Sequence, residues 1–466
     1  MKNWNVRKIV VAPEEMPEEH RLKKSLSWPH LIFLGVGAIV GTGILVLIGE
    51  AAGKAGPAMM LSFLIAGVIC AAAALAYAEV ATLIPASGSA YTYSYVVFGE
   101  LIAWFVGWSL ILEYSLVVSA VSVGWSGYFA PLVGIPRELA TAPLLGGVFN
   151  FPAVFIIAVI AGLLIYGIRE SANLNSVLVA IKMLALAMFI IVALRVFNGA
   201  NFEPFMPYGF GKNGPPGHEV GVMAAAAIIF FAFYGFDAIS TAAEEAKNPG
   251  RDLAIGIIGS MLICVLIYMA VAAAALGAEP YQRFARSTEP LALILRDIGQ
   301  GGAAKILALS ASVGMPTVIL AFFYGQSRVF LSMSRDGLLP PALARLSGRR
   351  NPVRITLFTA VVVALLAGLV PLSDLVALAN AGTLTAFIAV CAAMLTLRRR
   401  EPDAKRMFRT PLPWVTGLIG ILGCAYLFYS LPRYTQMWFV LWNAAGILLY
   451  MLFASRSAER TRTAGG

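Results

Sequence analysis

The sequence predicts an all-α integral membrane protein with twelve transmembrane helices: two inverted repeats of five, followed by two further helices. Three observations support this: the composition, the number of long apolar segments, and glycine interruptions in two of them. The chain of 466 residues is 59% hydrophobic and 12% charged, with a mean hydropathy of +0.82, whereas soluble domains have about 25% charged residues. Twelve segments can cross about 30 Å of hydrocarbon; they span residues 31–50, 57–83, 99–129, 152–168, 173–197, 219–245, 253–277, 302–333, 354–371, 374–397, 412–430 and 436–454.

The first span contains four glycines within nine residues, Gly35, Gly37, Gly41 and Gly43. Each glycine costs about 1 kcal/mol relative to alanine inside a helix. A free backbone group in lipid costs several kcal/mol more unless protein or a water-filled cavity receives it. The segment is therefore either a closely packed small-residue helix face or a broken helix that holds a ligand with its backbone.

The sixth span favours the broken helix, because it is interrupted too, by Gly235 and Asp237. It comes five spans after the first, and paired interruptions of this kind are typical of inverted-repeat transporters. The expected organisation is a cytoplasmic tail, two five-helix repeats, two additional helices and a second cytoplasmic tail, at residues 1–27, 28–198, 199–398, 399–455 and 456–466.

The two breaks predict a site for an α-amino acid. If the first span runs outward, its outer half begins near Gly41 to Gly43, where free N–H groups and the positive end of the helix dipole suit a carboxylate. If the sixth span runs inward, its outer half ends near Phe231 to Tyr234, where free carbonyls suit an ammonium group. The inference concerns only the head group of the ligand.

Three ionisable residues fall at membrane depth, where an unpaired charge costs about 2.5–3.5 kcal/mol or more. Lys182 lies roughly 14 Å into the fifth span, and either couples transport to a proton or ties carbonyls of the first span in place. Glu113 is a protonated carboxyl, a counter-charge or a contact for a cationic substrate. Asp237 either caps the inner half-helix or contacts the substrate.

The aromatic cluster of the sixth span is expected mainly to pack, with Phe231 as the candidate gate over the substrate. The four cysteines and three histidines form no ligand cluster, so we expect no metal and no cofactor. No nucleophile–base arrangement is present, which argues against an enzyme. The two competing classes are a channel, which needs a continuous polar pore, and a receptor that binds an amino acid without moving it.

The charge distribution indicates orientation. With the N-terminus inside, 24 of the 34 Lys and Arg residues fall on cytoplasmic segments, nine fall on or near the outer side, and Lys182 falls within a span. This bias predicts a multi-pass protein of the plasma membrane with both termini cytoplasmic. It also accounts for the net charge of +10, because these cations face anionic headgroups of the lipid bilayer, and no nucleic acid partner is needed.

Long motifs resemble the amino acid–polyamine–organocation (APC) transporter superfamily and, within it, the bacterial cationic amino acid transporter-like family. The resemblance covers residues 25–455. It rests on the runs at 37–44, 85–93, 98–104, 107–114, 230–238, 243–252, 324–330 and 334–340. It implies the LeuT-type fold of five plus five inverted helices and coupled import of amino acids.

The resemblance also implies roles for individual residues. Lys182 would stand where sodium-coupled relatives hold a sodium ion, which favours proton coupling. Phe322 on the eighth span would fill the space that a long cationic side chain needs, so a small or medium neutral substrate fits at least as well as a cationic one. Exchange and polyamine transport remain alternatives, and an accessory membrane subunit stays unknown. The carboxylate would bind at Ile39, Val40, Gly41, Thr42 and Gly43, and the amine at Phe231, Ala232 and Tyr234.

Overall fold

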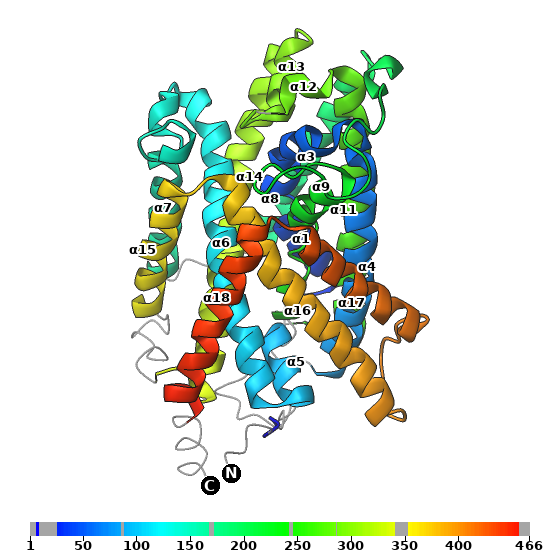
Figure 1. Ribbon diagram of the computed structural model, residues 1–466, viewed down its shortest axis with the longest axis vertical. Coiled ribbons are helices and arrows are strands. Elements are labelled where there is room, and N and C mark those ends of the chain that lie inside the picture. The colour runs from blue at the N-terminus through cyan, green and yellow to red at the C-terminus, as the bar shows by residue number, and fades with distance from the viewer. Residues whose placement is uncertain are drawn as a thin grey trace.

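The computed structural model describes residues 6–8, 26–84, 88–166, 172–241, 246–285, 287–340 and 353–455. These residues form one helical bundle (Figure 1), and their only β pairing is two isolated bridges, Leu26 with Ala246 and Asn213 with Val220. The all-α prediction is confirmed. The motif residues at 85–87 and 243–245, and most of both predicted tails, lie outside the described residues.

The first half of the chain contains the helices that include the first break. They are α1 (Trp28–Ile39), α2 (Thr42–Leu45), α3 (Leu47–Ala55), α4 (Met59–Leu83), α5 (Ser89–Phe98), α6 (Glu100–Val133), α7 (Phe151–Tyr166) and α8 (Ala172–Leu194).

The second half contains the second break and the two additional helices. Its helices are α9 (Val222–Ile229), α10 (Asp237–Thr241), α11 (Pro249–Ala278), α12 (Tyr281–Phe284), α13 (Pro290–Asp297), α14 (Gly301–Arg335), α15 (Val353–Leu369), α16 (Leu372–Arg400), α17 (Pro413–Ser430) and α18 (Arg433–Leu449). A 3₁₀ turn, η6 (Phe230–Ala232), follows α9 directly.

Eight helical stretches among the described residues are long and apolar enough to cross a membrane, so the chain is a multi-pass membrane protein. Four shorter apolar helices accompany them, Trp28–Ile39, Phe151–Tyr166, Val222–Ala232 and Val353–Leu369. Two of these four are the segments that the glycine pattern interrupts. Helices α5, α12 and α13 were not expected, because none of them is long enough to register as a span.

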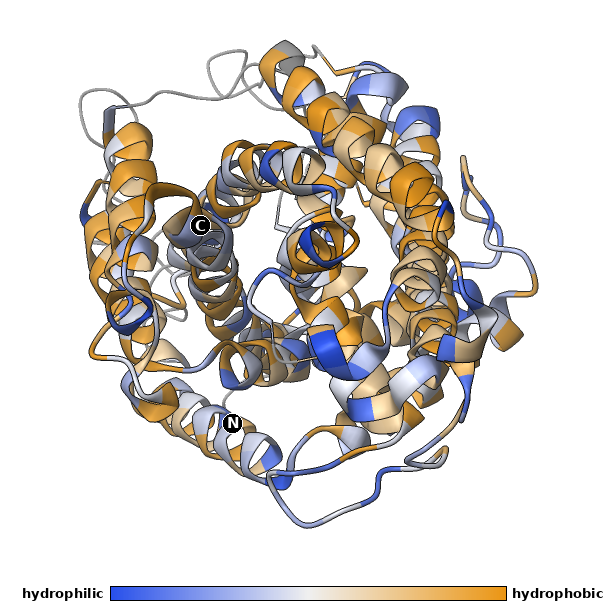
Figure 2. Ribbon diagram, turned by 90° about the horizontal axis from the view of Figure 1, so that it is seen from above, coloured by the Kyte–Doolittle hydropathy of each residue, from blue (hydrophilic) through white to orange (hydrophobic). Residues whose placement is uncertain are grey.

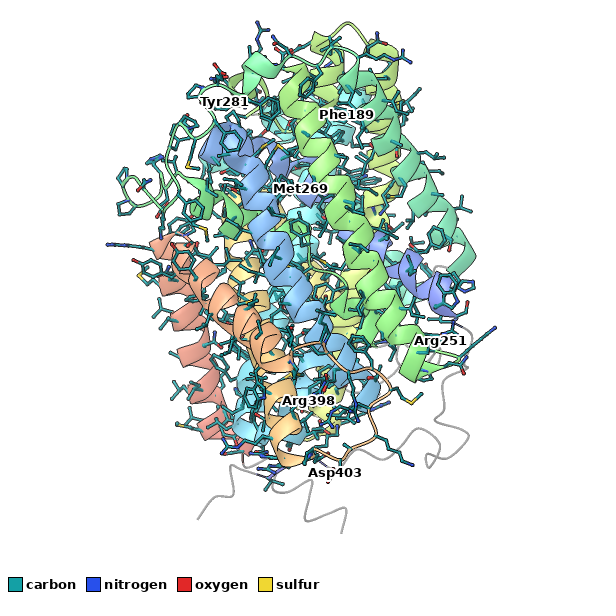
Figure 3. The ribbon with its side chains drawn as sticks, turned by 90° about the vertical axis from the view of Figure 1, so that its right-hand side faces the viewer. Phe189, Arg251, Met269, Tyr281, Arg398 and Asp403 are labelled. Carbon is teal, nitrogen blue, oxygen red and sulfur yellow. The ribbon has the colours of Figure 1, made fainter. Side chains whose placement is uncertain are left out.

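The outside of the bundle is apolar and its ends are polar. Hydrophobic ribbon predominates around the periphery in the view from above (Figure 2). Large apolar side chains such as Leu422, Tyr429 and Trp438 on the peripheral α17 and α18 are exposed. Arg398 and Asp403 lie towards one end of the bundle and Tyr281 towards the other (Figure 3). This distribution suits a bilayer around the middle of the bundle and water at its two ends.

Candidate functional site

The first apolar segment is broken between α1 and α2. Helix α1 ends at Ile39, neither Val40 nor Gly41 has helical backbone, and α2 begins at Thr42. Within the described residues, the N–H groups of Gly41, Thr42 and Gly43 have no acceptor, because the helix turn that would supply one is missing. The sequence-based expectation of a break at this point is therefore met in the backbone.

The second break separates α9 from α10. The 3₁₀ turn η6 ends at Ala232, residues 233–236 follow without regular helix, and α10 begins at Asp237. Gly235 has φ +123°, a conformation that side-chain-bearing residues rarely adopt. The carbonyls of Phe231 and Ala232 accept no hydrogen bond from any described residue. This break therefore leaves acceptors free where the first leaves donors free.

The two breaks touch. A Cβ atom added to Gly43 would lie 2.3 Å from the Cα of Ala232, and one added to Gly235 would lie 3.0 Å from the carbonyl of Ala38. Only glycine permits either approach, because a methyl group in these positions would overlap backbone atoms. The fold thus brings the free donors of one helix break beside the free acceptors of the other.

Lys182 on α8 holds the C-terminal end of α1. It is 2% exposed, and its Nζ donates to the carbonyls of Gly37 and Val40, each at 2.9 Å. Tyr268 on α11 donates its hydroxyl to the carbonyl of Ile39 at 2.9 Å. A cation at the negative end of a helix dipole is favourable, so the ammonium group stabilises the broken geometry of α1.

Helix α14 closes the first break on another side. The Thr42 hydroxyl contacts the sulfur of Met315 at 3.6 Å, and a Cβ on Gly41 would lie 3.2 Å from Val318. Gly314 makes room for Lys182, since a Cβ there would lie 2.4 Å from the lysine's Cγ. The break and its lysine are therefore packed against the same helix.

Two buried carboxyl groups flank the second break. Glu113 on α6 is 1% exposed, and neither of its oxygens has a hydrogen-bond partner among the described residues. Asp237 accepts from the Gly235 N–H at 3.2 Å and from the Tyr114 hydroxyl at 3.1 Å. A buried carboxylate without donors is costly, so a protonated Glu113, or one that accepts a hydrogen bond from a ligand, is more stable here than a bare carboxylate.

An aromatic wall stands between the second break and α14. The Phe322 ring lies 5.5 Å from that of Tyr114 and 6.4 Å from that of Tyr234. Phe231 packs edge-on against Tyr234 at 5.1 Å. The Tyr234 hydroxyl is buried and has no partner among the described residues. These rings limit the space available beside the free backbone groups.

Three polar residues that sequence reasoning missed complete the site. Tyr114 bonds to Asp237, Tyr268 bonds to α1, and Asn380 on α16 donates its amide to the carbonyls of Ala227 and Ile228 at 2.7 and 3.1 Å. The sequence did point to Asn380, since a lone amide side chain in an apolar span needs hydrogen-bond partners. The tyrosines gave no such signal, because they also suit apolar packing.

Comparison with known proteins gives the family context of this geometry. The sequence profile of the amino acid permease family matches residues 26–453. A branched-chain amino acid permease of Bacillus subtilis is 44% identical over 95% of each chain. A methylthioribose transporter of the same organism is 41% identical over 93% of this chain and 94% of its own. A vacuolar cationic amino acid transporter of Arabidopsis thaliana is 36% identical over 82% of this chain and 65% of its own.

Proposed function

Since the chain belongs to the amino acid permease family, within the APC superfamily, we propose that it imports L-amino acids by proton symport and alternating access. Membership of the family makes it a transporter rather than an enzyme. The observation that supports the mechanism best is the contact between two helix breaks, one with free N–H groups and one with free carbonyls.

The proposed architecture is a LeuT-type bundle of twelve transmembrane helices in the plasma membrane. The first repeat covers residues 28–198 and the second covers 199–398, with α17 and α18 outside the repeat. Its support is the pair of broken segments, α1 to α3 and α9 to α10, which begin the two repeats.

In the proposed site, the substrate carboxylate binds the N–H groups of Gly41, Thr42 and Gly43, and the amine binds the carbonyls of Phe231 and Ala232. Donors and acceptors of the backbone fit both charged ends of an amino acid without a buried side-chain charge of either sign. Ile39, Val40, Tyr234 and Asp237 form the surrounding wall. Phe231 is the proposed gate, because it belongs to the second break and its ring packs against Tyr234.

Lys182 is the proposed coupling residue. As an ammonium group it binds two carbonyls at the end of α1, and loss of its proton weakens both contacts. Proton occupancy and the geometry of the first break are therefore linked, and by reciprocity the substrate that binds this break changes the proton affinity of Lys182.

The proposed substrates are small to medium neutral amino acids. Phe322 packs against Tyr114 and Tyr234 and occupies space beside the head-group site, and one relative is named a branched-chain amino acid permease. A cationic substrate is the second candidate, supported by the unpartnered carboxyl of Glu113. Methylthioribose is a third, supported only by the name of a relative.

Uptake into proteoliposomes tests these proposals. We expect leucine, valine or alanine to accumulate when the outside is made acidic, and arginine to accumulate much less. Accumulation of external amino acid only in vesicles that were preloaded with amino acid would make the protein an exchanger. Binding in a thermal-shift assay without uptake under any gradient would indicate a receptor. If methylthioribose alone stabilises the protein and is taken up, the amino acid site is wrong.

A further inference from the structure

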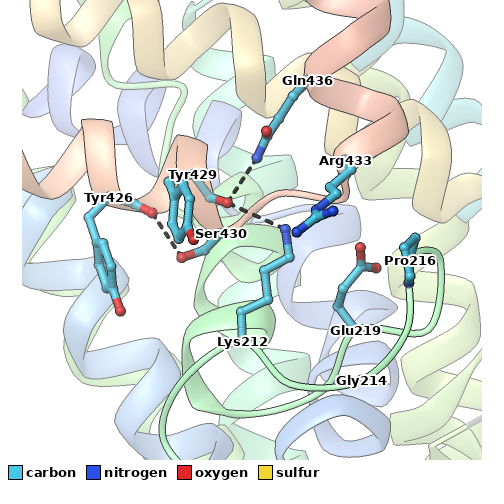
Figure 4. A pocket seen from close by; sticks show the side chains of 9 residues that line it. All are labelled: Lys212, Gly214, Pro216, Glu219, Tyr426, Tyr429, Ser430, Arg433 and Gln436. Carbon is cyan, nitrogen blue, oxygen red and sulfur yellow. Dashed lines mark hydrogen bonds between the residues drawn. The ribbon is translucent and has the colours of Figure 1, made fainter.

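A pocket outside the proposed transport site lies between the loop that precedes α9 and the junction of α17 with α18 (Figure 4). Its volume is about 250 Å³. None of its residues belongs to the proposed transport site. The lining consists of Lys212, Gly214, Pro216, Glu219, Tyr426, Tyr429, Ser430, Arg433 and Gln436.

We call these nine residues the headgroup pocket. Two of them are cationic, Lys212 of the loop and Arg433 of α18. Lys212 donates its Nζ to the carbonyls of Tyr429 and Leu431, and burial lowers the pKa of its amine. Arg433 is the first residue of α18 and has no ion pair within the described part of the chain. The first turn of α18 adds free N–H groups and the positive end of a 17-residue helix. An anion is the ligand that these groups suit.

The pocket also contains an acceptor, on the same loop as Lys212 (Figure 4). Glu219 is 4% exposed; its Oε2 accepts from the Gly217 N–H at 3.1 Å, whereas its Oε1 has no partner among the described residues. Neither Lys212 nor Arg433 makes an ion pair with the Glu219 carboxyl. Lys212 does interact electrostatically with Glu219 and with Arg433. A buried carboxylate oxygen without a donor is unfavourable, so the pocket also calls for a donor from outside the chain, such as an amine.

The pocket is placed at the edge of the bundle. Helices α17 and α18 lie at the periphery, and their junction is directed to the same end of the molecule as α12 and α13 (Figure 1). Tyr426 and Tyr429 on α17 are exposed beside the pocket, Tyr429 by 67%. Exposed tyrosines at the end of a lipid-facing helix mark the interface between hydrocarbon and headgroups.

We propose that the headgroup pocket binds the zwitterionic headgroup of a phospholipid, with its phosphate on Lys212, Arg433 and the start of α18, and its amine on Glu219. Arginine and helix N-termini are both good phosphate ligands. The volume suits a small polar headgroup rather than a drug-sized molecule. The phosphate chemistry is shared with free phosphate, and the experiment below separates the two sources.

Native mass spectrometry of the purified, delipidated full chain tests the proposal, with short-chain phosphatidylethanolamine, short-chain phosphatidylglycerol, phosphoethanolamine and inorganic phosphate as probes. We expect phosphatidylethanolamine to bind best. Arg433→Gln should weaken both lipids at least fivefold. Glu219→Gln should weaken phosphatidylethanolamine and leave phosphatidylglycerol unchanged, because only the former has an amine. Lys305→Gln, which removes an exposed cation of α14 outside the pocket, is the matched control.

Three results would overturn the proposal. Equal lipid binding by the wild-type protein, Arg433→Gln and Glu219→Gln would remove the pocket as the site. Binding of inorganic phosphate that depends on Arg433, without any lipid adduct, would make it a free-phosphate site. Amino acid binding that depends on Glu219 would make it a second site for the substrate. Melting temperatures without lipid verify folding, and transport assays are independent, because the pocket shares no residue with the transport site.

Discussion

Lys182 is the residue on which the proposed coupling depends. We expect Lys182→Ala to lose the stimulation of uptake by an acidic outside, at least tenfold, because the variant has no group that binds a proton beside the first break. Lys182→Arg is the matched control for structure: it keeps the cation at the end of α1 but does not release its proton. It should fold and bind substrate yet remain insensitive to the pH gradient. Wild-type pH dependence in Lys182→Ala would assign coupling elsewhere.

Phe322 is the residue expected to limit substrate size. Replacing it by alanine removes the ring that packs against Tyr114 and Tyr234. We expect the ratio of arginine to alanine uptake to rise about tenfold, which corresponds to about 1.4 kcal/mol. Phe323→Ala is the control, because its ring is buried on the same helix but makes no ring contact with either tyrosine among the described residues. An unchanged ratio in Phe322→Ala would show that another residue sets the size limit.

Gly43 is the residue whose missing side chain lets the two breaks meet. We expect Gly43→Ala to lower the melting temperature and abolish substrate binding, because its Cβ would lie 2.3 Å from the Cα of Ala232 and overpacking costs about 1–3 kcal/mol. Gly162→Ala on α7 has nothing within 4 Å of the new Cβ and should be neutral or stabilising. Equal melting temperatures and binding in the two variants would contradict the close approach. Thermal melting and ligand binding provide the measurements.

At the scale of helices, glycine and the spacing of spans were enough to locate both breaks. The positions of Gly41, Gly43 and Gly235 mark backbone that cannot continue as a helix cheaply in lipid, so these elements were predictable. The contact of Lys182 with carbonyls of the first break was one of its two expected roles. The contacts of Tyr268 and Asn380 were not predicted, because both residues come from helices distant in sequence. Tertiary packing, rather than any local pattern, selects them.

The long apolar helices were predicted better than the short helices that lie between them. Helix α5 (Ser89–Phe98) is too short to span a bilayer and therefore gives no hydropathy signal. Helix α13 (Pro290–Asp297) carries apolar residues on one side and charged ones at its end, a pattern that an apolar-run search passes over. Both lie between long helices, where chain length alone says little about structure.

A buried ion cluster fastens α4 to the end of α16. Glu79 on α4 is 2% exposed and accepts from Arg398 at 2.6 Å and from the Thr410 N–H at 2.8 Å, with Arg406 at 3.0 Å. We expect Glu79→Gln to destabilise the protein by about 3–5 kcal/mol, because it leaves the buried Arg406 and the partly buried Arg398 without their counter-charge.

The matched control for that cluster is Glu50→Gln. Glu50 on α3 is paired with Lys54 at 3.7 Å, and its side chain is 37% exposed. Exposed pairs contribute only about 0–1 kcal/mol. The melting temperatures of both variants in the same detergent provide the comparison. Equal losses would show that the cluster at Glu79 has no special role in joining α4 to α16.

The whole molecule combines an apolar perimeter with charged ends, and the charges at the ends predict its orientation in the membrane. Exposed large apolar side chains are spread along α7, α8, α15, α17 and α18, a surface that would drive aggregation in water but suits lipid. The excess of Lys and Arg lies on the segments at one end. Because orientation in the membrane follows this bias, the end that carries Arg398 and Lys405 should be cytoplasmic.

Cysteine labelling in whole cells tests this orientation. Arg137 follows α6 and Lys405 follows α16, and both side chains are exposed. We expect a membrane-impermeant maleimide to label Arg137→Cys in intact cells, and Lys405→Cys only after the membrane is opened. The background is low, because Cys70, Cys264, Cys391 and Cys424 are all buried. The reverse pattern would invert the topology: the free N–H groups of the first break would then begin the inner half of their span, and the proposed direction of import would lose its structural basis.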